Sequence, residues 1–181
     1  MPAPSHVLLF GRLTLGIVFA LSGITKLANV HAFVASVGDF RLLPRRLVAP
    51  FAVGVVAAEL ASAAALLRGI GVEAAAVVVL VLLAIFTTAL VRSLSRGRTV
   101  VCRCFGELSA RSLSWTAVLR NGLLLALAAA TVVSAWIDGD QPPPSGDVAA
   151  VLLLVLGSLA VLALVGEAGA AFTFEAPSES K

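Results

Sequence analysis

The sequence has few charged residues and almost no cysteine. Only 13% of its 181 residues are charged, and it contains just two cysteines and two histidines. Soluble domains carry about a quarter charged residues, so this composition excludes an ordinary soluble protein. Hydrophobic residues make up 60% of the chain, and the mean hydropathy is +1.05. We therefore expect an integral membrane protein in contact with the lipid bilayer.

Three further absences narrow the possibilities. The net charge of +3 does not predict nucleic-acid binding, because the arginines cluster in two loops. We expect no zinc site, because zinc needs about four ligands and His6 and His31 are distant from the cysteines in sequence. No basic cluster precedes the first apolar run, and Arg12 interrupts that run. A cleaved signal peptide is therefore not expected.

Five apolar runs approach the ~20 residues that a transmembrane helix needs. Three successive prolines stand in the polar turn before the last run. Trp115 and Trp136 bracket the fourth run, where aromatic rings anchor helices at both interfaces. The sequence predicts an all-α, polytopic transmembrane helix bundle with a four-helix core and a fifth C-terminal transmembrane helix. The expected spans are 7–28, 48–67, 72–91, 113–136 and 148–165, within a single integral membrane domain over residues 1–166.

The remaining segments are shorter and more polar. Phe33, Val37 and Phe40 recur at helical spacing, which predicts a short interfacial helix over about 31–42. A loop over 92–112 contains both cysteines. Residues 167–181 are expected to form a polar, flexible tail.

The positive charges favour one orientation in the membrane. By the positive-inside rule, the loops after the first and third spans face the cytoplasm, because they hold most of the basic residues. These residues are Lys26, Arg41, Arg45, Arg46, Arg92, Arg96, Arg98, Arg103 and Arg111.

The two cysteines form a Cys102-Arg103-Cys104 sequence. A disulfide between residues so close would close a small, strained ring, which exchanges readily. Cationic neighbours such as Arg103, Arg98 and Arg111 stabilise the nucleophilic thiolate. We therefore expect thiol/disulfide exchange at a membrane surface. Two alternatives remain open: the cysteines are small apolar residues with a packing role only, or their thiolates bind Cu(I).

Glu59 lies near the middle of the second span, where an ionised carboxylate needs a partner. Arg120 of the fourth span is one candidate. Lys26, at the end of the first span, either extends to the interface or joins this pair. Such a pair would lock two helices together, or it would line a polar pocket that binds the head group of a membrane quinone and relays protons.

Several short motifs together resemble the MauE family of methylamine-utilisation proteins, within the broader DoxX-like group. The resemblance covers about residues 7–136, and the Cys-x-Cys-Phe-Gly element is its most specific part. The motifs are Phe19-x-x-Ser22-Gly23-x-x-Lys26-Leu27, Leu42-Leu43-Pro44, Glu59-Leu60, Cys102-Arg103-Cys104-Phe105-Gly106 and Arg120-Asn121.

The resemblance implies a DoxX-like four-helix core in a bacterial cell membrane. It also implies redox-associated work with a thioredoxin-like partner that supports disulfide formation in a client protein, as proposed for the small subunit of methylamine dehydrogenase. Cys102 and Cys104 would exchange, and Arg103, Lys26, Glu59 and Arg120 would support them. This work takes place outside the cytoplasm, opposite to the charge rule.

Whether the chain is itself a thiol-disulfide oxidoreductase is left open. The alternative is a non-enzymatic membrane assembly factor or a Cu(I)-handling protein.

Overall fold

The computed structural model describes residues 4–39, 44–96, 101–102, 111–112, 115–138 and 155–156. Four long helices in these ranges are apolar enough to cross a membrane. The described elements are α1 (Pro4–Ala28), α2 (Val30–Asp39), α3 (Arg45–Arg68), α4 (Val72–Ser95), β1 (Val101–Cys102), β2 (Arg111–Ser112) and α5 (Trp115–Asp138). The predicted fold class, an all-α polytopic membrane helix bundle, is confirmed, with one very short strand pair added.

Each of the four long helices extends beyond the apolar run that predicted it at one end at least. α3 begins at Arg45, and α4 continues to Ser95. Arginine and serine lower the hydropathy without interrupting helical hydrogen bonding, so the apolar run marks the membrane crossing and not the helix end. Of the predicted span 148–165, the structure describes only residues 155–156, which are helical. The predicted tail lies outside the described residues.

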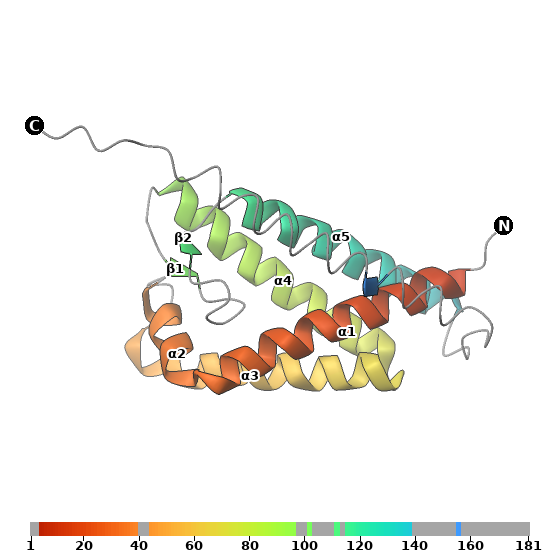
Figure 1. Ribbon diagram of the computed structural model, residues 1–181, viewed down its shortest axis with the longest axis horizontal. Helices are drawn as coiled ribbons and strands as arrows, with labels where there is room; N and C mark the ends of the chain where they lie inside the picture. Colours follow the sequence, from red (N-terminus) through yellow and green to blue (C-terminus); the bar gives the residue numbers. More distant parts are fainter. Residues whose placement is uncertain are drawn as a thin grey trace, which may run out of the picture.

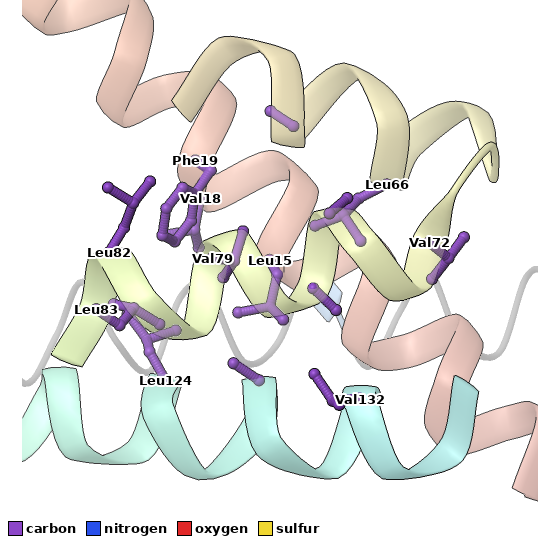
Figure 2. Close-up of a cluster of buried hydrophobic side chains, with 14 of the residues drawn as sticks. Leu15, Val18, Phe19, Leu66, Val72, Val79, Leu82, Leu83, Leu124 and Val132 are labelled. Carbon is purple, nitrogen blue, oxygen red and sulfur yellow. The ribbon is translucent and has the colours of Figure 1, made fainter. Parts of the chain in front are cut away.

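The four long helices pack as a closed ring in which sequence neighbours run in opposite directions (Figure 1). α1 packs against α3 and α5, and α4 packs against the same two helices. Figure 2 shows leucine, valine and phenylalanine side chains from all four helices meeting at the centre. Burial of this apolar surface between the helices forms the core.

Glycine allows α1 to approach its neighbours closely. A methyl group at Gly16 would come within 2.8 Å of Leu67, and one at Gly23 within 2.7 Å of Leu60, both on α3. Gly11 lies against Thr131 of α5 in the same way. Small residues at such contacts strengthen packing between membrane helices, because they let the backbones approach.

The two ends of the bundle differ. One end, which we call the hairpin end after the β1–β2 pair, is where α1 and α4 end and α3 begins. α2 and the β1–β2 pair also lie at this end (Figure 1). At the far end, α1 begins, α5 ends, and Gly69–Gly71 turn the chain from α3 into α4. α2 packs against the first half of α3 and buries Phe33 and Ser36.

Candidate functional site

A buried ion pair joins the end of α1 to the middle of α3. Lys26 is 2% exposed and Glu59 is 1% exposed. The ammonium group of Lys26 donates to Oε1 of Glu59 and, over 3.0 Å, to Oγ of Ser22. Ser22 lies one turn earlier on α1, and helical side chains point toward the N-terminus, so the lysine side chain reaches back to it.

Two aromatic rings complete the surroundings of the ammonium group. Nζ of Lys26 lies 5.1 Å from the ring centroid of Phe33 on α2 and 4.8 Å from that of Phe86 on α4. Cation–π attraction is stronger where water is excluded. Side chains from α1, α2, α3 and α4 therefore all meet at this charge.

The carboxylate of Glu59 is less completely paired than the ammonium group. Ser22 also interacts with this carboxylate. Oε2 nevertheless has no hydrogen-bond partner among the described residues. One oxygen of a buried carboxylate is thus left without a donor, which is costly away from water.

The pair lies deep in the apolar part of the bundle. At ~1.5 Å per residue, Glu59 is about 21 Å along α3 from Arg45 and about 14 Å from Arg68. Lys26, although it ends α1, lies at this depth because α1 and α3 are staggered and α2 covers the end of α1.

α5 contributes polar side chains at the same level. Gly11 of α1 lies against Thr131 of α5, and the two helices are antiparallel. From that contact toward the hairpin end, Ser22 is about 16 Å along α1 and Asn121 about 15 Å along α5. Asn121 is buried, and its Oδ1 lacks a partner among the described residues. Arg120 beside it is half-buried. We call Ser22, Lys26, Glu59 and Asn121 the buried polar layer.

The ion pair of Glu59 differs from the first expectation, in which its partner was Arg120. Among the described residues, the ion pair of Glu59 is with Lys26, the other candidate. Lys26 is enclosed and does not extend to the interface, so it should not count as a topology signal. Sequence reasoning missed the ring of Phe86, because a phenylalanine in an apolar run carries no signal. Asn121 did carry one, as an amide within a transmembrane span.

Only part of the predicted cysteine site can be placed. Cys102 lies in β1, and its main chain is opposite Arg111 in the antiparallel pair. This pair follows α4 in the sequence and lies at the hairpin end (Figure 1). Cys104 and Arg103 lie outside the described residues.

Comparison with known proteins covers both the buried polar layer and the cysteine segment. The family model for methylamine utilisation protein MauE matches residues 4–134. A methylamine utilization protein MauE of Paracoccus denitrificans is 36% identical over 120 residues, which are 66% of this chain and 64% of that protein.

Two other relatives carry the same name. The one from Paracoccus versutus is 33% identical over 143 residues, covering 78% of this chain and 76% of that protein. The one from Methylorubrum extorquens is 34% identical over 119 residues, covering 65% of this chain and 64% of that protein. No solved structure matches. The family model matches most of this chain, from α1 through nearly all of α5. The chain therefore belongs to the MauE family.

Proposed function

We propose that this chain is a membrane thiol/disulfide exchange protein that acts through Cys102 and Cys104. It works with a thioredoxin-like partner and supports disulfide formation in a client protein. By the names of its relatives, its role lies in methylamine utilisation. The client would then be a disulfide-containing protein of that process.

One observation carries the proposal. Both cysteines of the chain lie in the connection between α4 and α5. Its described part is the β1–β2 pair, in which the main chain of Cys102 faces that of Arg111. Arginine side chains at the adjacent helix ends, Arg92 and Arg96, are exposed. Positive charge near a thiol favours the thiolate, the form that attacks disulfides.

The exchange conserves electrons and atoms. The thiolate of one cysteine attacks a partner disulfide, forms a mixed disulfide and displaces the partner's other sulfur as a thiolate. The second cysteine then attacks the mixed disulfide, which oxidises Cys102 and Cys104 and releases the partner reduced. The Cys102–Cys104 disulfide returns to the dithiol by accepting two electrons from a client dithiol, which becomes a disulfide. In the opposite direction, the dithiol passes two electrons and two protons to a membrane quinone, and the disulfide so formed oxidises the partner's dithiol.

A redox titration of the purified full chain tests this proposal. After equilibration in thiol/disulfide buffers and alkylation, mass spectrometry should show both thiols disappearing together at one potential. Cys102→Ser and Cys104→Ser variants should each lose this two-electron step and instead form a mixed disulfide with a thiol of the buffer. If both sulfurs of the unmodified chain stay reduced at every potential, the proposal is wrong. Stoichiometric Cu(I) binding by that reduced pair would then favour the Cu(I)-handling alternative.

The compartment of the chemistry can be tested in the same chain. An impermeant maleimide applied to intact cells labels Cys102 and Cys104 only if they face outward. Outward labelling is expected for client maturation, because disulfides persist outside the cytoplasm. Labelling only after lysis would contradict that role.

The arginine opposite Cys102 offers a test of thiolate stabilisation. Arg111→Gln should slow alkylation of the reduced pair at neutral pH, because less thiolate is present. Arg68→Gln, at the far end, is the matched control and should leave the alkylation rate unchanged. Equal rates in both variants would remove Arg111 from the proposed site.

A further inference from the structure

Two hydrogen-bond acceptors of the buried polar layer are unpaired within the described part of the chain. Oε2 of Glu59 and Oδ1 of Asn121 have no partner among the described residues. Both residues are more than nine-tenths buried, with exposed fractions of 1% and 7%. Buried acceptors are almost always paired, because an unpaired one has lost its hydrogen bonds to water. A donor or a proton at Oε2 of Glu59 would therefore be favourable.

Lys26 is not available as that donor. Its ammonium group has three N–H bonds. They are directed among Oε1 of Glu59, Oγ of Ser22 and the faces of Phe33 and Phe86. Turning one of them toward Oε2 of Glu59 or toward Asn121 would give up a contact already made. Lys26 therefore leaves Oε2 of Glu59 unpaired.

Few other titratable groups face Glu59. Lys26 faces it from α1, and α5 carries Arg120 at the level of Ser22. α2 and α4 contribute the rings of Phe33 and Phe86 at this point. The titratable or charged side chains that these two helices carry within the described ranges are all exposed: His31, Asp39, Glu73 and Arg92.

We propose that Glu59 is a proton-exchange site within the membrane-spanning bundle. A proton that binds to Oε2 converts the carboxylate into a carboxylic acid and so removes the unpaired anionic oxygen. Release of that proton restores the ion pair with Lys26. The site needs no electron transfer, so it does not depend on the proposed function of the cysteines.

Apolar side chains close the layer from both sides. Between the layer and the far end, the core consists mainly of leucine and valine, including Leu15, Leu66, Val79 and Val132 (Figure 2). On the hairpin side lie the ring of Phe33 and the buried α3 side chains Ala52, Val55 and Val56. Proton exchange at Glu59 therefore passes through apolar packing on either side.

Carbodiimide labelling tests the proposal directly. Dicyclohexylcarbodiimide, an apolar reagent, modifies protonated carboxyl groups and enters lipid. In the full chain reconstituted in lipid, peptide mass spectrometry should find Glu59 modified, with a rate that falls by up to about tenfold per pH unit as the carboxyl ionises. Glu59→Gln should remove this modification. Glu73, exposed at the far end, is the control site. A water-soluble carbodiimide with an added amine should modify Glu73 and leave Glu59 unmodified.

Three further results distinguish a proton-exchange site from a permanently ionised pair or a hydrated carboxylate. Lys26→Met should increase labelling of Glu59 several-fold at neutral pH, because the carboxylate loses its counter-ion. If that variant does not fold, the pH dependence in the unmodified chain still decides. Absence of modification at every pH would show a permanently ionised pair and overturn the proposal. Equal modification of Glu59 and Glu73 by the water-soluble reagent would also overturn it, because the carboxylate would then be in water.

Discussion

Both ends of the bundle join helices through a polar contact, but the two contacts have different surroundings. At the far end, Nε1 of Trp136 donates to Oε1 of Glu73 over 2.6 Å, and both groups are exposed. Toward the hairpin end, Lys26 and Glu59 are enclosed by four helices. Water can replace either partner of an exposed contact, whereas a buried charge that loses its partner has no substitute. The buried contact toward the hairpin end therefore contributes more to stability than the exposed contact at the far end.

Backbone geometry closes the far end. Gly69 caps α3 in the left-handed conformation, and the N–H groups of Gly69 and Ile70 donate to carbonyls of the last turn. The guanidinium group of Arg12 lies directly over Gly69. A cation at the C-terminus of a helix is favourable, because it opposes the negative end of the helix dipole. Stability at this end thus depends on shape more than on ion pairing.

The largest effect is expected from breaking the buried pair. Lys26→Met and Glu59→Leu should each lower the free energy of unfolding by about 3–5 kcal/mol, because each leaves one charge uncompensated. The double variant should cost much less than the sum. Denaturant unfolding in detergent, read as a double-mutant cycle, measures this coupling. Additive losses would show that the two charges do not interact, and Arg92→Met is the exposed control.

A smaller loss is expected at the closest helix contacts. A methyl group at Gly11 collides with the buried, branched side chain of Thr131, so Gly11→Ala should cost about 1–3 kcal/mol. Gly23→Ala meets Cδ2 and Cγ of the flexible side chain of Leu60 and should cost less. Thr131→Ala should partly rescue Gly11→Ala.

Thermal unfolding of the single and double variants checks this order. Gly122→Ala is the control on α5, because no atom lies within 4 Å of its added methyl group. It should be neutral or stabilising. A larger loss at Gly23 than at Gly11 would mean that α1 packs more tightly near the buried pair than at the far end.

The turn at the far end allows a finer comparison. Gly69 and Gly71 both have positive φ, 72° and 59°, so alanine at either should cost about 1–2 kcal/mol. Gly69→Ala should cost more, because its methyl group would lie 2.6 Å from Nη2 of Arg12, whereas nothing lies near Gly71. Unfolding free energies of the two variants test this difference. Equal losses would mean that Arg12 moves aside freely.

The smallest effect is expected at the exposed contact. Trp136→Phe should lower stability by no more than about 1 kcal/mol, because water replaces the indole N–H that donates to Glu73. Glu73→Gln should have a similar effect. The same unfolding measurement applies. A loss as large as that of Lys26→Met would contradict the difference between the two ends.

The four long helices could be predicted because apolar runs of sufficient length have few alternatives in a membrane protein. The choice between Arg120 and Lys26 as the partner of Glu59 could not. Counting residues from span ends assumes that the helices start level, whereas α1 is staggered against α3, with Gly23 beside Leu60. The position of Glu59 in an apolar run was enough to predict that it needs a partner. The sequence could not predict that the rings of Phe33 and Phe86 lie beside this pair, because packing on neighbouring helices sets the rotation of each helix about its axis.

The position of Glu59 has a consequence for how the chain enters the bilayer. An acidic residue at the centre of a lone helix opposes insertion by about 3 kcal/mol on translocon scales. α1 emerges from the ribosome first and brings the ammonium group of Lys26 with it. Retention of α3 in the lipid thus benefits from a counter-charge already in place, which makes assembly of these two helices a joint event during biogenesis.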